Sequence, residues 1–208
     1  MIDLKVFKRI RKYMAAIIAC SFVLVAGCGS SPYPEAGASA GPAADYEYLI
    51  GPGDTMEIFV WGNQELTTSV VVKPDGKITT RLVENIEASG KTASQLARSV
   101  EEAYATYVKS PVVSVIVGGF VGVPYQQVRV VGEASEPKSI PFKKHMSVLD
   151  LMISVGGLTE FAAGNRAVLV RDDRSYSLRL EDLLKDGDIS ANVAMMPGDI
   201  VIIPEAWF

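Results

Sequence analysis

The sequence predicts an α+β protein in which two small modules follow one another along the chain. Short runs of alternating apolar and polar residues recur between residues 46 and 208, separated by turn signals rich in glycine, proline and aspartate. Only two stretches, near residues 92–107 and 147–155, carry apolar residues at helical spacing. We therefore expect a compact α+β module over residues 46–118, a joint over residues 119–125 and a second module over residues 126–208.

The first 27 residues have the pattern of a secretory signal peptide. Five basic residues precede an uncharged, mostly apolar run from Tyr13 to Gly27, which is shorter than the roughly 20 apolar residues of a membrane-spanning helix. The run ends in Leu24-Val25-Ala26-Gly27-Cys28, which resembles a bacterial lipobox and so implies cleavage before Cys28 and its lipidation. An ordinary signal peptide followed by an unrelated cysteine is the alternative. No aspartate follows Cys28, so we expect a lipid anchor in the outer membrane that faces the periplasm.

Residues 28–45 are expected to form a flexible tether, because they are mostly glycine, serine, alanine and proline and offer little to bury. Removal of residues 1–27 would leave 15 basic and 23 acidic residues, a net charge of −8. That charge argues against nucleic acid or anionic lipid as the main partner. With Cys20 removed, Cys28 would be the one remaining cysteine, which excludes a disulfide within the mature chain.

The first module begins with a strand, turn and strand pattern. Residues 49–50 lead into the turn Gly51-Pro52-Gly53-Asp54, and apolar residues alternate over residues 56–60. A second strand over residues 69–72 is followed by Lys73-Pro74-Asp75-Gly76, which predicts a hairpin turn into residues 77–81. Thr92-Ala93-Ser94-Gln95 has the pattern of a capping box, and the helix behind it should end before Pro111. A strand over residues 112–117 completes the module.

The second module is expected to be a β-grasp domain, because several strands surround one short helix and a late strand closes the unit. Its strands are expected over residues 126–131, 167–171, 175–180 and 200–203. Ser147 should cap the helix, which Gly156 and Gly157 should end.

One turn occurs in both modules. Asp54 closes a proline–glycine–aspartate turn before the strand at residues 56–60, and Pro197, Gly198 and Asp199 form the same turn before residues 200–203. Proline and glycine set the backbone of such a turn, and the aspartate accepts hydrogen bonds from local amides. We interpret Pro52, Gly53, Asp54, Pro74, Asp75, Gly76, Pro197, Gly198 and Asp199 as structural turn residues. Ligand binding by Asp54 or Asp199 is the alternative.

No catalytic constellation is visible, and we expect neither an enzyme nor a metal or cofactor site. His145 is the single histidine of the chain, which argues against histidine-rich metal sites and catalytic triads. It lies in a basic loop with Lys143 and Lys144. That loop is most simply a solvated one, although the two lysines could contact an anionic polymer or a partner.

The large aromatic residues are assigned mainly to the core. Trp61, Tyr104 and Tyr107 fit the buried positions of a strand end and a helix. Trp207 and Phe208 are harder to bury at a chain end, and contact with a partner and packing on the protein's own surface both remain open.

The chain resembles bacterial polysaccharide export proteins. The resemblance rests on Tyr48-Leu49-Ile50-Gly51-Pro52-Gly53-Asp54, Ile58-Phe59-Val60-Trp61, Val72-Lys73-Pro74-Asp75-Gly76-Lys77-Ile78 and Ser110-Pro111-Val112-Val113. The second module, from Val128-Arg129-Val130-Val131-Gly132 to Pro197-Gly198-Asp199-Ile200, resembles the β-grasp, soluble-ligand-binding domain of that family. Gly119-Phe120-Val121-Gly122 is similar to the exosortase-associated type.

This resemblance implies a lipoprotein that forms a homo-oligomeric ring and conducts exopolysaccharide across the periplasm to the outer membrane. It also implies an inner-membrane co-polymerase, or chain-length regulator, as a partner. Five residues follow Ile203, too few for the C-terminal membrane helix of large family members, so we expect a short form that works with a separate outer-membrane β-barrel. A periplasmic lipoprotein that binds a soluble glycan and has no transport role is the alternative.

Overall fold

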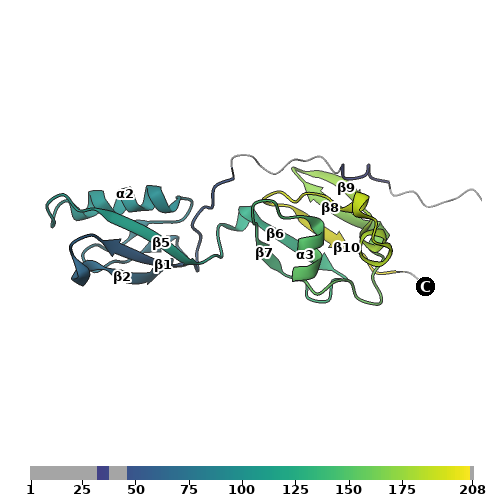
Figure 1. The fold of residues 1–208 in the computed structure, drawn as a ribbon, viewed down its shortest axis with the longest axis horizontal. Helices are drawn as coiled ribbons and strands as arrows, with labels where there is room; N and C mark the ends of the chain where they lie inside the picture. Colours follow the sequence, from purple (N-terminus) through teal and green to yellow (C-terminus); the bar gives the residue numbers. More distant parts are fainter. Residues whose placement is uncertain (1–31, 38–45, 207–208) are drawn as a thin grey trace, which may run out of the picture. The chain divides into compact units, whose positions relative to one another are not determined.

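The computed structural model describes residues 32–37 and 46–206 (Figure 1). Its buried hydrophobic residues fall into two separate cores, one between Ile50 and Val113 and the other between Val128 and Ile203. We call the parts of the chain around these cores the first and the second module. Each combines a small β-sheet with one α-helix, which confirms the α+β class. Short helical turns complete the described elements: η2 (Gln64–Leu66), η3 (Pro124–Gln126), η4 (Gly164–Arg166), η5 (Asp182–Asp186) and η6 (Ile189–Ala191).

The first module is a three-stranded antiparallel sheet in the order β2-β1-β5. The central strand β1 (Thr55–Val60) lies between β2 (Thr68–Val71) and β5 (Val113–Gly119), and helix α2 (Ala93–Tyr104) packs against β5. Met56, Ile58 and Val60 are buried whereas Thr55 and Glu57 are exposed, as expected for a strand with one covered face. The sheet therefore has one face in the core and one open face.

Helix α2 begins as the sequence predicts. The Thr92 hydroxyl accepts from the Gln95 amide at 3.2 Å, and the Gln95 side chain accepts from the Thr92 amide at 3.0 Å. The helix ends at Tyr104, where the amides of Tyr107 and Val108 both donate to the Tyr104 carbonyl and the chain turns away. Because of this turn Tyr107 leaves the core and is 65% exposed, so its assignment to the core was wrong.

Two expectations for the sheet of the first module were also wrong. Residues 49–50 form no strand; the amide of Ile50 instead donates to the Lys91 carbonyl in the loop before α2. The turn at residues 73–76 is present, with Gly76 at φ 82°, but β3 (Lys77–Ile78) pairs with β4 (Ile86–Glu87) while β2 pairs with β1. Turn residues set the local bend of a hairpin, whereas packing in the shared core selects the partner strand.

The second module is a five-stranded sheet in the order β7-β6-β10-β8-β9. Its last strand β10 (Ile200–Ile203) lies parallel to its first strand β6 (Gln127–Gly132) and antiparallel to β8 (Ala167–Arg171). The edge strands are β7 (Ser139–Pro141) and β9 (Arg174–Leu178). The sheet is covered by one helix, α3 (Val148–Ser154), and the closing strand β10 pairs in parallel with the first strand β6. This is the expected β-grasp arrangement.

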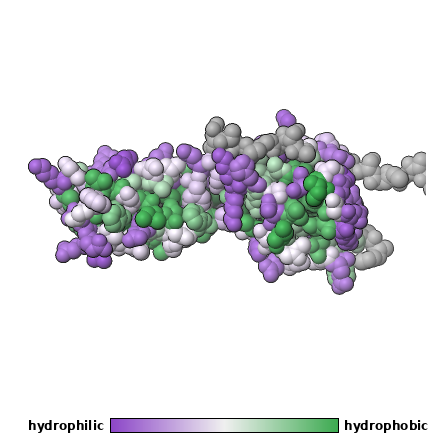
Figure 2. Space-filling view, in the orientation of Figure 1, coloured by the Kyte–Doolittle hydropathy of each residue, from purple (hydrophilic) through white to green (hydrophobic). Residues whose placement is uncertain are grey.

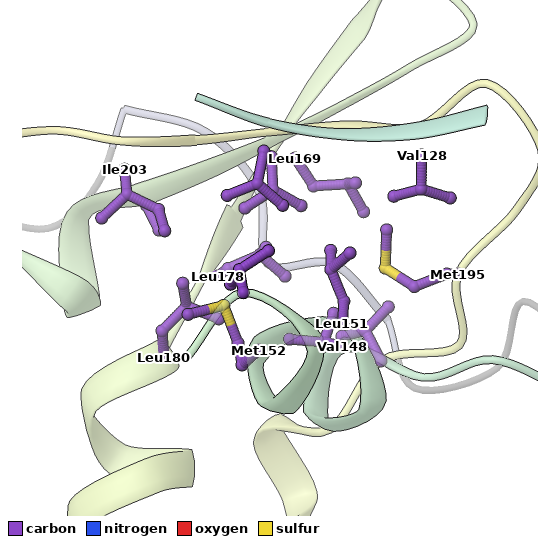
Figure 3. Close-up of a cluster of buried hydrophobic side chains, with 14 of the residues drawn as sticks. Val128, Val148, Leu151, Met152, Leu169, Leu178, Leu180, Met195 and Ile203 are labelled. Atoms are coloured by element: carbon purple, nitrogen blue, oxygen red, sulfur yellow. The ribbon is translucent and has the colours of Figure 1, made fainter. Parts of the chain in front are cut away.

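Helix α3 supplies one side of the second core. Ser147 caps it, with its hydroxyl accepting from the Asp150 amide, and Gly156 and Gly157 at φ 76° and 83° follow its end. Figure 3 shows Val148, Leu151 and Met152 of the helix facing strand residues of the sheet, among them Leu169, Leu178 and Ile203.

Part of the expected tether is attached to the sheet. The Ala36 amide donates to the Ser177 carbonyl at 3.1 Å, and the Ser177 amide donates to Pro34 at 2.8 Å. These bonds extend the sheet at the open edge of β9, which otherwise offers unpaired backbone groups. Residues 34–36 thus differ from a free coil. The signal peptide, Cys28, Trp207 and Phe208 lie outside the described residues.

Candidate functional site

The two proline–glycine–aspartate turns have the same geometry. In each, the amide three residues before the aspartate donates to its carboxylate: Gly51 to Asp54 at 2.9 Å and Met196 to Asp199 at 2.7 Å. The glycines before the two aspartates have φ 93° and 89°, a conformation that side chains rarely adopt. Both carboxylates are almost completely buried, at 0% and 1% exposure. The repeated sequence therefore makes one structural device twice.

Asp54 joins three segments of the first module. Besides Gly51, its carboxylate accepts from the Tyr48 hydroxyl at 2.6 Å and from the amides of Val121 and Gly122 at 2.6 and 3.0 Å. No ion pair of Asp54 is present in the described part of the chain, so hydrogen bonds alone replace the water that this carboxylate loses. Burial of Tyr48, and next its bond to the Asp54 carboxylate, raise the pKa of Tyr48 well above its usual range.

Asp199 is neutralised by an arginine. The Arg171 guanidinium donates from Nε to Oδ1 at 2.8 Å and from Nη2 to Oδ2 at 2.6 Å, and Nη2 also reaches the Ala194 carbonyl at 2.9 Å. This bidentate pair ties β8 to the turn before β10. The protein's own donors occupy both buried carboxylates, so the geometry offers neither to an external ligand. In the third turn, Asp75 is exposed and its carboxylate accepts from the Lys77 amide at 3.2 Å.

The basic loop lines a cavity of about 400 Å³ in the second module. Lys143, Lys144 and His145 lie on its wall, with Ile140 and Ile153 beside them. His145 has φ 68°, which is uncommon for a residue with a side chain. Asp150 also lines the cavity, and its hydrogen bonds from Ser147 lower the pKa of this carboxyl. Sequence reasoning treated the loop as simply solvated; the structure adds a concave wall next to it.

A second cavity, of about 410 Å³, lies in the first module and was not anticipated. Residues 62–66, which follow β1, form one wall, and Tyr107 and Val108 form the other. Trp61 directly precedes this wall and is 71% exposed, so its assignment to the core was wrong as well. Figure 2 likewise shows hydrophobic residues on one face of the surface of the first module. In the sequence, the polar run Gly62-Asn63-Gln64-Glu65 was the feature that could have indicated this cavity.

Within residues 32–37 and 46–206, no cluster of three or more histidine, cysteine, aspartate or glutamate side chains could hold a metal ion. The helices of the same residues include none that is both long and apolar enough to cross a membrane.

The fold is thus a three-stranded sheet with one helix followed by a β-grasp sheet, with a buried aspartate turn before β1 and another before β10. Residues 42–118 match the family described as polysaccharide biosynthesis/export protein, and residues 126–203 match the SLBB domain. The chain belongs to the polysaccharide export proteins.

Two curated relatives are similar to most of the chain. The EPS I polysaccharide export outer membrane protein EpsA of Ralstonia nicotianae is 26% identical over 187 residues, which is 76% of this chain and 47% of the relative. The protein of the same name from Ralstonia solanacearum is 26% identical over 183 residues, which is 74% of this chain and 47% of the relative. The chain thus matches about half the length of each relative.

Proposed function

We propose that the protein is a non-catalytic component of an exopolysaccharide export machine. The observation that carries this proposal is the order of the two modules, an export domain followed directly by an SLBB domain, over residues 42–203. The names of the two relatives, which are export proteins of the outer membrane, support the same role. In this role the chain guides a polymer and leaves its covalent bonds unchanged.

Deletion of the gene tests the export role. We expect surface and secreted polysaccharide to be lost while early sugar assembly on the inner membrane continues, and the wild-type gene supplied in trans should restore secretion. Extracellular polymer and lipid-linked sugar are measured in the same cultures. Normal extracellular polymer in a strain without a second copy of the gene would contradict the proposal.

The proposed anchor is a lipid on Cys28, at the outer membrane and facing the periplasm. Mass spectrometry of the mature N-terminus should find an acylated cysteine, and Cys28→Ser should accumulate the uncut precursor. Cys20→Ser is the matched control, because Cys20 lies inside the apolar run that would be removed. An unmodified N-terminus at a later residue would rule out the anchor.

The proposed assembly is a homo-oligomeric ring that receives polymer from an inner-membrane co-polymerase and passes it to an outer-membrane β-barrel. Cross-linking in cells should give a ladder of multimers, and purified protein in liposomes should form no large channel alone. A strictly monomeric pattern at native abundance would contradict the ring. A monomer that binds glycan tightly, in cells whose export survives the deletion, would instead favour the alternative of a glycan-binding lipoprotein.

A further inference from the structure

The cavity of about 410 Å³ in the first module has a rigid frame. Backbone bonds hold its first wall: Asn63 donates to Val60 at 3.2 Å, and Leu66 donates to Asn63 at 3.0 Å. The second wall is held by the bonds of Tyr107 and Val108 to the Tyr104 carbonyl, at 2.8 and 2.9 Å. A site whose backbone is fixed before a ligand arrives loses little conformational entropy on binding.

The side chains on this frame are free. Asn63, Gln64, Glu65 and Tyr107 have no side-chain hydrogen bond or ion pair within the described residues, although each carries a polar group at the cavity. In contrast, the polar groups of the two buried turns are occupied by the protein itself. The amides of Asn63 and Gln64 can both donate and accept, which matches a ligand with many hydroxyl groups.

Apolar groups complete the surface. Leu66 and Leu82 line the cavity and pack against the core of the first module, so they form a fixed apolar part of the wall. Tyr107 is 65% exposed, and a tyrosine ring presents a flat face with negative charge density. The C–H groups on one face of a sugar ring carry partial positive charge and suit such a face, while the hydroxyl groups at its rim suit the amides.

The charge of the cavity selects among sugars. Glu65 is the one acidic residue among the described residues that line it, and neither lysine nor arginine lines it. A uronic acid or another anionic sugar would meet the Glu65 carboxylate with no cation on the cavity wall to compensate, and like charges repel at this range. Neutral and amino sugars carry no such penalty.

We infer that this cavity, formed by residues 62–66 with Leu82, Tyr107 and Val108, is a binding site for neutral or amino sugar units of the exported polymer. The inference rests on the proposed function, because that function supplies the polysaccharide. It assigns to the first module a direct contact with the glycan, with Tyr107 as the stacking residue and Glu65 as the residue that disfavours acidic sugars.

Direct binding tests the site. The full chain with Trp207→Phe keeps Trp61 as its single tryptophan, and the fluorescence of Trp61, next to Gly62, should report binding. The probes are oligosaccharides of about six to ten sugars, released by mild acid from the surface polysaccharide of the producing strain and separated by charge into neutral and acidic pools. Isothermal titration calorimetry on the chain with both tryptophans gives an independent Kd.

Three variants distinguish binding at this site from nonspecific binding of oligosaccharides. Tyr107→Ala should weaken binding of the neutral pool about fivefold. Tyr125→Ala is the matched control, because Tyr125 is 62% exposed and lies outside the cavity, and it should leave Kd unchanged. Glu65→Gln should improve binding of the acidic pool and leave that of the neutral pool nearly unchanged.

The outcomes are separable from those of the export test. No binding of either pool, stronger binding of the acidic pool by the unaltered chain, or equal Kd for Tyr107→Ala and Tyr125→Ala would overturn the inferred site, even if deletion of the gene abolishes export. Binding that behaves as expected in a strain whose export survives deletion would support the site and reject the export role.

Discussion

Gly122 donates its amide to Asp54 Oδ1 at 3.0 Å, although the two residues are 68 positions apart in the sequence. The contact places the segment after β5 against the turn before β1. The approach is close: a Cβ added at Gly51 in the same turn would lie 1.9 Å from the Gly122 carbonyl oxygen. The buried Asp54 carboxylate and the close approach at Gly51 therefore fix the position of the segment that follows β5.

Asp54→Asn should destabilise the first module by about 2–4 kcal/mol. The asparagine amide would put a donor among the four donors that surround the carboxylate and would weaken the bonds that remain. Urea unfolding followed by Trp61 fluorescence in a Trp207→Phe background measures the change. Asp75→Asn is the control, because Asp75 is exposed and its loss should change stability by less than about 0.5 kcal/mol. Equal losses in the free energy of unfolding for the two substitutions would contradict a special stabilising role of Asp54.

Arg171→Ala should destabilise the second module by about 3–5 kcal/mol, because it leaves the Asp199 carboxylate buried without a cation. In the double variant Arg171→Ala/Asp199→Asn the uncompensated charge is gone, so part of the lost stability should return. A double-mutant cycle by chemical denaturation, completed with Asp199→Asn, measures the coupling. Additive single effects would contradict a direct interaction.

Tyr104→Phe should leave stability unchanged or raise it by about 1 kcal/mol. The Tyr104 hydroxyl is buried and has no hydrogen-bond partner among the residues that the structure describes, so its removal takes away an unsatisfied polar group without opening a cavity. Thermal unfolding of the two proteins at equal concentration is the measurement. A clear loss of stability would mean that an ordered water or another group satisfies the hydroxyl in solution.

Gly132→Ala should destabilise the second module much more than Gly187→Ala. Both glycines have positive φ, at 93° and 72°, so both substitutions strain the backbone. At Gly132 the new Cβ would also lie 2.0 Å from the Ile203 carbonyl oxygen, whereas nothing lies within 4 Å at Gly187. We expect about 1 kcal/mol for Gly187→Ala and a loss of more than about 3 kcal/mol for Gly132→Ala. Similar midpoints of unfolding would contradict the close approach of β6 and β10.

Asp150 should titrate below the usual carboxyl value of about 3.9. The Ser147 hydroxyl and then the Ser147 amide donate to its carboxylate and lower its pKa. A depressed folded-state pKa adds stability at pH values above the unfolded pKa, and this contribution is lost as the pH falls through the folded pKa. An NMR titration of the side-chain carboxyl gives the value, and Ser147→Ala should shift it upward. A midpoint at or above the usual value in the unaltered protein would refute the cap.

The features that the sequence predicted well are local ones. The capping box at Thr92, the helix cap at Ser147 and the three turns depend on residues within three or four positions of each other, so side-chain chemistry decides them. The final strand, residues 200–203, was also predicted with its correct bounds, because a strongly apolar run after a turn has few alternatives.

Most of the features that were missed depend on distant contacts. Periodicity placed Tyr107 on the buried face of a helix, but α2 ends at Tyr104 and the ring points to solvent. The attachment of residues 34–36 to β9 involves a partner far along the chain. The pairing of β3 with β4 joins nearby segments, but the turn residues before β3 do not indicate which strand it pairs with. The sequence offered the polar run of the candidate sugar site but not its second wall, since the two walls are about 40 residues apart and the aromatic residue had been assigned to the core.

The sequence by itself determined the α+β class, the two modules, the helix starts, the turns and the family, because each follows from short-range chemistry or from the order of motifs. Tertiary structure alone decided that Asp54 accepts from Val121 and Gly122, that Arg171 neutralises Asp199, and that Tyr107 lines the same cavity as Asn63 and Gln64. The physical reason is that strand pairing and burial are selected by the packing of a whole core, to which residues far apart in the chain contribute together.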